Sequence, residues 1–351
     1  MRRSTVLVAL VVVGCSAQSP QPTAVHSTAS PSVVATTPGG PSPTSSAAAS
    51  DVGLSCRIPV MLSGYQGDTP GGWITFPGGS FHEDPSSKIP RQTNNELISF
   101  DRAFNRWVPA TWDHISPDGR RYAVAIGSGV DLVDVATGQH RAMAMPQVNG
   151  SWSVINFNAK GVYLTLLGGE GPAEPGLWLL DPDSAAVRKL DGTQLWSQVD
   201  SRAAWTVVPI TGGWELRRLD LQAGIVSTEL TIPYRVAVPG ADQPLELISL
   251  DAQGRPLVLE RDWPEPHPWR IGLLTATEHL QPVQFPDEWT VGSTPAMNGK
   301  GRIKGHLLSG GIWFTGEFSF AGLAFLPTAT TVIRPVATGP GNIVAIAGGC
   351  H

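Results

Sequence analysis

The feature that most limits the fold of this chain is a short unit that recurs along it. Its clearest copy is TWDHISPDGRRYAVAIGSGVDLVDVATGQHRAMAM, residues 111–145, which contains four strand-like pieces. Turn clusters separate the pieces at residues 117–119 (PDG), 127–129 (GSG) and 136–138 (ATG). Strand-forming segments bounded by such turns indicate a four-stranded antiparallel meander.

Both halves of the unit occur again. A turn followed by a β-rich strand is found at residues 158–167, 200–208, 251–260 and 298–308. A hairpin made of an apolar strand, an Asp or Thr, a short turn and a second strand is found at residues 97–108, 132–143, 177–190, 217–230, 272–283 and 324–336. The spacing of roughly 33 to 55 residues suits one supersecondary unit with loops of variable length.

Six such hairpins predict an all-β chain folded as a β-propeller of six four-stranded blades. The segment ISPDGRRYAVAI, residues 115–126, resembles the repeat of TolB-like and WD-repeat-like propellers of bacterial envelope proteins. This resemblance extends more loosely over residues 97–336. It implies a fold and no particular reaction, because propellers host many functions. A β-sandwich, or two smaller β domains, is the alternative.

The first residues, MRRSTVLVALVVVGC, predict export. Two arginines precede the apolar run 6–13, which is far shorter than the roughly 20 residues needed to cross a bilayer. The run ends in VVGC, which resembles the lipobox of bacterial lipoproteins, although Val13 stands where that family more often has Ala or Ser. The resemblance implies removal of a signal peptide, residues 1–14, and attachment of a diacylglycerol to Cys15. A conventional signal peptide is the alternative.

The segment that follows is rich in Ser, Thr, Pro and Ala, and residues 16–50 contain no Lys, Arg, Asp or Glu. Such a composition cannot bury enough apolar surface to fold. We therefore predict a disordered tether over residues 15–50 and a globular domain over residues 51–351. The expected location is the cell membrane, where the lipid on Cys15 would hold the domain outside the cytoplasm or in the periplasm. A disordered tail without a role fits the composition equally well.

Two cysteines remain for the globular domain. Cys56 and Cys350 lie at its two extremes, and disulfides persist in exported proteins. In a propeller the first and last strands meet, and residues 343–350 (IVAIAGGC) have the pattern of a closing strand, with residues 54–62 as its partner. We therefore predict a Cys56–Cys350 disulfide that closes the ring. Two free thiols are the alternative in a reducing compartment.

Charge and motifs exclude several function classes. Charged residues are only 15% of the chain and the net charge is −5, which argues against nucleic acid or an anionic membrane surface as an electrostatic partner. The nucleophile elbow, the zinc-protease motif and the spaced cysteine pairs of zinc sites do not occur. We therefore predict no catalytic residue, metal ion or cofactor. The run SFHEDP, residues 80–85, could help to bind a cation, but adjacent strand residues face opposite ways, which favours a polar loop.

Twelve tryptophans are the one excess in the composition. Large rings fill the wedge-shaped space between blades well, so we predict that most of the tryptophans pack there. The tryptophans expected in this position are Trp73, Trp107, Trp152, Trp178, Trp205, Trp214 and Trp313.

Propeller topology selects a candidate binding face. The loop between the second and third strands of a blade lies on the same face as the connections between blades. Two such loops are long, at residues 168–176 and 261–270. The predicted binding residues in these loops are Glu170, Arg261, Trp263, Glu265, His267 and Trp269. Rigid aromatic rings beside charged groups could stack on a sugar or a peptide. A loop that packs its tryptophans back on the ring is the alternative.

These features favour a membrane-anchored binding module that recognises a peptide, a glycan or a protein partner outside the cytoplasm. A propeller-type hydrolase, such as a lactonase or a glycan-cleaving enzyme, would need acidic or His residues at the start of the innermost strand in several blades. His114 alone has that position. A structural scaffold of the cell envelope is the third possibility.

Overall fold

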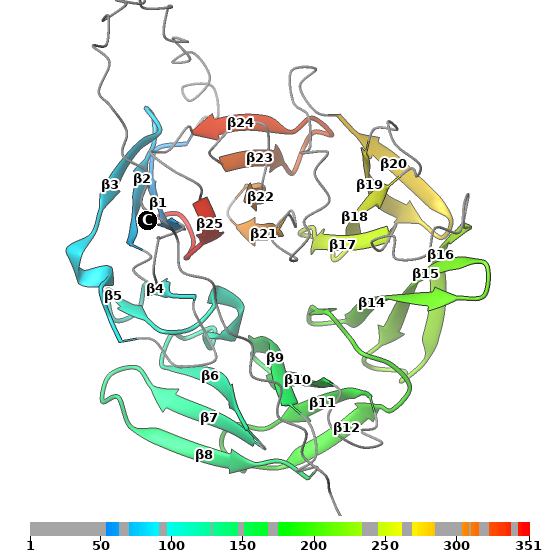
Figure 1. Cartoon of the computed structure of the whole chain (residues 1–351), viewed down its shortest axis with the longest axis horizontal. Helices are drawn as coiled ribbons and strands as arrows, with labels where there is room; N and C mark the ends of the chain where they lie inside the picture. Colours follow the sequence, from blue (N-terminus) through cyan, green and yellow to red (C-terminus); the bar gives the residue numbers. More distant parts are fainter. Residues whose placement is uncertain are drawn as a thin grey trace, which may run out of the picture. The chain divides into compact units, whose positions relative to one another are not determined.

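Six blades follow one another round a ring in chain order (Figure 1). The computed structural model describes residues 54–62, 70–90, 97–127, 129–146, 151–167, 175–233, 245–261, 269–284, 304–308, 310–315, 323–337 and 343–351. All of them belong to one compact unit, Ser45–His351. The described helices are two single 3-10 turns, η3 (Pro85–Ser87) and η4 (Trp112–His114). The predicted all-β six-bladed propeller is confirmed. Residues 1–50, which include Cys15 and the predicted tether, lie outside the described residues.

Five blades are antiparallel four-stranded sheets. From the innermost strand outward, blade 1 contains β25 (Ile343–Ile346), β1 (Arg57–Leu62), β2 (Gly71–Thr75) and β3 (Ser80–Glu83). In the same order, blade 3 contains β9 (Ser151–Asn158), β10 (Gly161–Leu167), β11 (Leu177–Leu180) and β12 (Val187–Asp191). Blade 4 contains β13 (Gln198–Val199), β14 (Ala203–Ile210), β15 (Gly213–Asp220) and β16 (Val226–Pro233). Blade 5 contains β17 (Leu245–Leu250), β18 (Pro256–Arg261), β19 (Trp269–Ala276) and β20 (His279–Val283). Blade 6 contains β21 (Lys304–Leu308), β22 (Gly311–Thr315), β23 (Leu323–Pro327) and β24 (Arg334–Ala337).

Blade 2, the remaining blade, has three strands instead of four. It contains β6 (Arg121–Ile126), β7 (Gly129–Asp134) and β8 (His140–Ala144). Its innermost position is held by a single bridge between Ile115 and Tyr122. The four pieces predicted for residues 111–145 are thus three strands and one bridge.

An additional two-stranded hairpin, β4 (Ser99–Asp101) and β5 (Arg106–Val108), lies between blades 1 and 2. The sequence pattern at residues 97–108 suggested the outer hairpin of a blade. Instead, the sixth outer hairpin is β2–β3, which the pattern did not single out. The number of blades is the predicted one. One of the six predicted hairpins, however, is the β4–β5 hairpin between blades 1 and 2, which we call the wedge.

The core is a series of apolar clusters, each between two neighbouring sheets. One cluster joins Ala123 and Leu132 of blade 2 to Val162 and Leu164 of blade 3, and others repeat the arrangement round the ring. The predicted tryptophans belong to these clusters: Trp73, Trp107, Trp152, Trp178, Trp205 and Trp313 are buried, and Trp214 is half-buried against its cluster. Aromatic packing between blades is therefore confirmed.

The Asp or Thr that marks each outer hairpin has a local cause. Asp134 accepts hydrogen bonds from the backbone N–H and the hydroxyl of Thr137, at 2.8 and 2.7 Å. Gly138 then takes a left-handed conformation, with φ of 69°, and its N–H donates to the Asp134 carbonyl. Aspartate side chains favour such turns because they mimic a backbone acceptor. Similar turns follow Asp181 and Asp220, which each accept from two backbone N–H groups, and the left-handed residue is Ala185 in the first and Gly224 in the second.

The ring closes in blade 1, as predicted. Residues Val60, Met61 and Leu62 of β1 pair with Ile346, Ala345 and Ile343 of β25. Beyond these strands, Cys56 and Cys350 form a disulfide with Cα atoms 5.7 Å apart. Figure 1 places the end of the chain beside β1.

Candidate functional site

The strand order divides the connections between two faces of the ring. We define the turn face as the one that carries the turns from first to second strand and from third to fourth strand. The loop face carries the connections from second to third strand and from one blade to the next. The polar side chains of the two faces differ in their hydrogen-bond partners.

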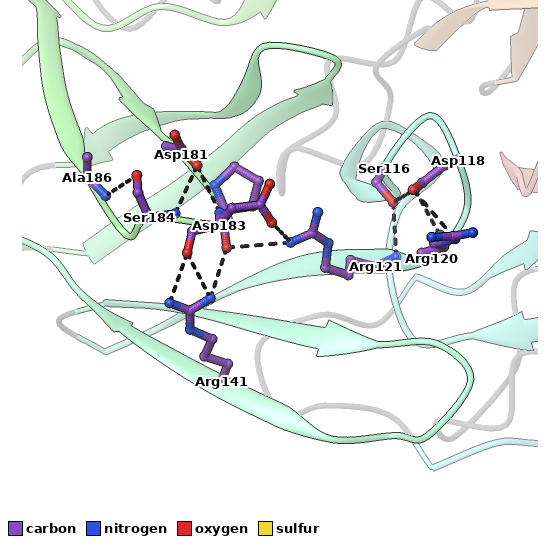
Figure 2. A network of polar contacts seen from close by, with 10 residues as sticks. Ser116, Asp118, Arg120, Arg121, Arg141, Asp181, Asp183, Ser184 and Ala186 are labelled. Carbon is purple, nitrogen blue, oxygen red and sulfur yellow. Dashed lines mark hydrogen bonds and ion pairs between the residues drawn. The ribbon is translucent and has the colours of Figure 1, made fainter.

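On the turn face, charged side chains hold neighbouring blades together. In Figure 2, Arg121 and Arg141 of blade 2 reach the turn that follows β11 of blade 3. Arg141 donates to the carbonyls of Pro182, at 3.2 Å, and Asp183, at 3.3 and 3.2 Å. Arg121 donates to the Asp183 carboxylate at 2.7 Å. These contacts bind one blade to the next.

The same device occurs at the two following interfaces. Lys160 of blade 3 donates to the Ser201 carbonyl of blade 4 at 2.9 Å. Arg202 of blade 4 donates to the Gln253 carbonyl of blade 5. Carbonyls in turns have no strand partner, so a neighbouring cation satisfies an acceptor that would otherwise need water. We interpret the turn face as structural.

His114, the residue that could have indicated a hydrolase, also joins two blades. Its ring donates a hydrogen bond to the backbone of Val154 in β9, and burial lowers the pKa of His114 from 6.5 to about 4. Its imidazole is therefore neutral at pH 7 and is used as a donor. Among the described residues, no group of three or more His, Cys, Asp or Glu side chains is arranged to hold a metal ion.

The run SFHEDP has a structural role in the described part of blade 1. Asp84 accepts hydrogen bonds from the indole N–H groups of Trp73, at 3.0 Å, and Trp107, at 2.9 Å, and it caps η3. Burial opposes ionisation, but hydrogen bonds from Ser86, Trp107 and Trp73 outweigh it and lower the pKa of Asp84 to about 2. Glu83 pairs with Lys88 at 3.3 Å. The carboxylates of this run thus serve blade 1 and the wedge.

The first predicted binding loop has the expected bounds, whereas the second is shorter than the predicted 261–270, because Arg261, Trp269 and Arg270 belong to the paired strands β18 and β19. Residues 168–176 join β10 to β11 and residues 262–268 join β18 to β19, the second and third strands of blades 3 and 5. Arg261 is paired with Trp269 in the ladder of blade 5. Glu170, Trp263, Glu265 and His267 lie outside the described residues. The structure therefore brings the backbones of Arg261 and Trp269 together and describes no contact of the other four.

Two more connections of this type escaped the sequence analysis. Residues 63–70 join β1 to β2, and residues 316–322 join β22 to β23. The connections between the second and third strands of blades 1 and 6 are therefore also long, with eight and seven residues. The strand bounds reveal them. Residues 63–70 (SGYQGDTP) contain turn-forming residues that could have indicated the first connection, whereas residues 316–322 (GEFSFAG) carry a weaker signal.

A polar cluster on the loop face was also missed. It lies at the seam of blades 3 and 4, where residues 192–197 cross from β12 to β13. Arg217 donates to Glu215 at 2.8 Å and to the side-chain oxygen of Gln194 at 3.1 Å. Gln194 is 7% exposed, and its amide nitrogen has no hydrogen-bond partner among the described residues. Leu195 beside it is 43% exposed.

This cluster had no signal in the sequence, because Arg217 and Gln194 are 23 positions apart. Their contact depends on how blade 4 packs against the crossing segment. Together with the predicted loops, it makes the loop face the candidate binding site.

Within the described ranges, no helix has the length and apolar character needed to cross a membrane.

The comparisons with known proteins concern the fold. No protein-family model and no curated protein sequence matches this chain. Among solved structures, it is similar to TolB from Acinetobacter baumannii, with 14% identity, a TM-score of 0.39, and coverage of 84% of this chain and 65% of that one. The β-propeller domain of the Trilobed protease from Pyrococcus furiosus has 11% identity, a TM-score of 0.42, and coverage of 81% and 80%. Oligogalacturonate lyase from Vibrio parahaemolyticus has 8% identity, a TM-score of 0.43, and coverage of 81% and 73%.

Proposed function

We propose that this propeller is a binding module of the cell envelope that recognises a peptide, glycan or protein partner on its loop face. The observation that carries the proposal is the difference between the faces. On the turn face, Arg121, Arg141, Lys160 and Arg202 are engaged with neighbouring blades. The loop face carries the longer connections and a partly exposed polar cluster. Binding residues commonly lie on loops that a rigid scaffold positions.

The scaffold under the principal loop supports this proposal. Strands β18 and β19 pair from Leu257 opposite Leu273 up to Arg261 opposite Trp269, so the loop 262–268 starts from a fully paired ladder. A ladder of this kind fixes the two ends of the loop and lowers the entropy that is lost on binding. Trp263 and Trp269 would supply the stacking surface, with Arg261, Glu265 and His267 around it and Glu170 on the loop of blade 3.

Anchoring completes the proposal. Diacylglycerol on Cys15 and the tether of residues 15–50 would keep the propeller close to the membrane, facing outside the cytoplasm. Labelling of the wild-type protein with radioactive palmitate, and loss of label in Cys15→Ser, would support this part. A Cys15→Ser protein that still carries label would remove the anchor.

The hydrolase alternative gains no support from the described residues. Its one candidate, His114, donates to the backbone of Val154 and is kept neutral by burial. The binding experiment includes a test of this alternative all the same.

The binding test uses defined probes. Wild-type protein is screened against arrays of pure oligosaccharides and synthetic peptides, and the best probe is measured by calorimetry. Trp263→Ala with Trp269→Ala should keep the thermal unfolding midpoint within a few degrees and weaken binding by about a hundredfold, because each buried aromatic contact contributes about 1–2 kcal/mol. The matched control is Ile225→Ala on the turn face, where the side chain is 64% exposed.

Two outcomes would overturn the proposal. Unchanged affinity in the double tryptophan variant, beside weakened binding in the control, would move the site to the turn face. Cleavage of an oligosaccharide probe, followed by chromatography, would replace the binding module by an enzyme.

A further inference from the structure

The last described residues of the chain do more than complete a strand. After β25, residues 347–351 continue between blade 1 and the wedge hairpin. The Ala347 N–H donates to the Pro59 carbonyl at 2.8 Å, and the Ala347 carbonyl accepts from Phe100 of β4 at 2.6 Å. Arg57 and His351 exchange two backbone hydrogen bonds, at 3.0 and 2.9 Å. This tail therefore touches β1 on one side and β4 on the other.

The side chains of the tail fit the same slot. The His351 ring meets the rings of Trp73 and Phe100 edge to face, with centroids 5.3 and 5.2 Å away. A Cβ atom at Gly348 would lie 2.9 Å from Pro59 and 3.2 Å from the Phe100 carbonyl, so only glycine fits this close approach. The tail thus covers an aromatic surface that belongs to both blade 1 and the wedge.

The strand before the tail is a weak holder by itself. β25 has four residues, and it pairs with β1 at three positions, with an irregularity at Leu62. A ladder of three pairs with a register shift is held by few hydrogen bonds, so it opens at a lower free-energy cost than a long ladder. The covalent bond between Cys56 and Cys350 fixes the far end of the tail. Both cysteines are half-buried at the surface, so a reductant can approach them.

We propose that the Cys56–Cys350 disulfide is a redox latch, and that its reduction releases residues 347–351 and uncovers the aromatic surface of Trp73 and Phe100. The reductant is a dithiol. One of its thiolates attacks a sulfur of the Cys56–Cys350 bond, and the other cysteine leaves as a thiolate and takes up a proton. The second thiol of the reductant then displaces the remaining cysteine. The protein gains two electrons and two protons, and the dithiol becomes a disulfide.

The opening is local because, of residues 347–351, Ala347 alone belongs to a described core cluster, the one that packs blade 1 on the wedge, and the other members of that cluster lie outside the tail. Ile343 and Ile346 of β25 stay in the cluster with Val60, Trp313 and Phe325. Met61, Ile98 and Trp107 keep blade 1 packed on the wedge. Reduction should therefore change the turn-face end of blade 1 and leave blades 3, 4 and 5 as they are.

The test is hydrogen–deuterium exchange of the intact protein, with and without dithiothreitol, followed by mass spectrometry. Reduction should raise the exchange rate of amides in residues 347–351 and of the Phe100 amide by about tenfold or more, since the latter donates to Ala347. Amides of β14 and β15 serve as the internal control and should not change.

A matched variant separates the latch from other effects of the reductant. Cys56→Ser with Cys350→Ser should show the fast exchange without dithiothreitol and should not respond to it. Unchanged exchange in the reduced wild type would overturn the proposal, because the tail would then be held without the bond. Faster exchange in every blade would overturn it as well, because the bond would then maintain the whole ring.

Discussion

The turn face and the loop face of the propeller are built from the same strands but use their polar residues in opposite ways. On the turn face, aspartates such as Asp134 shape their own turns, and cations such as Arg141 bind the turn of the neighbouring blade. The loop face carries the longest connections, although those at residues 127–128 and 211–212 are short. Its cluster of Gln194, Arg217 and Glu215 is partly exposed. Polar residues alone therefore do not identify a functional face.

Under the proposed function, a binding surface differs from a structural one in retaining hydrogen-bonding groups that the fold does not use. Blade 1 shows that the division is not absolute. Asp84 follows β3 at the loop-face end of the blade, yet it serves the indoles of Trp73 and Trp107. Substitutions at these residues can break or sharpen the contrast between the faces.

The largest effect is expected from Asp84→Ala. The substitution leaves two indole N–H groups without their acceptor, and each loss of this kind costs about 1–3 kcal/mol. The free energy of unfolding, measured with urea, should fall by about 2–4 kcal/mol. Asp84→Asn keeps a neutral acceptor and is the matched control, with a smaller loss.

Asp84 also gives the sign of a pH dependence. Its pKa in the folded protein is about 2, below the ordinary 3.8, so the unfolded chain binds the proton first. The stabilisation is complete above about pH 4 and is lost as the pH falls through 2. If wild type and Asp84→Asn lose stability equally between pH 4 and 2, the carboxylate does not have this role.

An intermediate effect is expected from the contacts of Arg121 and Arg141 with the turn of blade 3, which we call the clamp (Figure 2). Arg121→Ala with Arg141→Ala removes the donors to Pro182 and Asp183. Because these groups are partly solvated, the loss of unfolding free energy should be about 1–2 kcal/mol, and the affinity for a loop-face ligand should not change. Arg120→Ala is the matched control: its side chain is 76% exposed and lies 3.9 Å from Asp118, so it should be close to neutral. A fall in affinity without a fall in stability would place a ligand on the turn face.

The smallest effect on stability is expected from Gln194→Ala on the loop face. The substitution removes an acceptor of Arg217 but also an amide nitrogen that is buried without a partner, so the two terms nearly cancel. The free energy of unfolding should change by less than about 1 kcal/mol. Thermal unfolding measures it, with Leu195→Ala as a neighbouring exposed control. A loss above about 2–3 kcal/mol would make this cluster as structural as the clamp.

Much of the fold could be predicted because the turns are encoded locally. The run Ser116-Pro117-Asp118-Gly119 and the Asp134–Gly138 turn need no distant partner, and the spacing between such turns indicates the blades. Cys56 and Cys350 then indicated which ends meet. The hairpin at residues 97–108 has the same local pattern, so nothing in it reveals that it has two strands and no neighbours to complete a blade.

The site was harder to predict, because each polar role depends on the adjacent blade. Arg141 lies 41 positions from the Pro182 carbonyl that it binds, and Arg217 lies 23 positions from Gln194. In the sequence, these arginines look like ordinary exposed residues of a strand. The predicted loop 261–270, in contrast, is distinguished by its own composition, and its binding residues stay a prediction.

The closure of blade 1 also sets the order in which this protein can be completed. β1 is the first described strand to leave the ribosome and β25 is the last, and the bonded cysteines are 294 positions apart. Until residues 343–351 have been made, β1 has an open inner edge, and the ring can assemble only in part. Pairings over such distances form slowly. A truncated or stalled chain would therefore present an unfinished sheet to proteases and to other chains, and control of protein quality would begin at that edge.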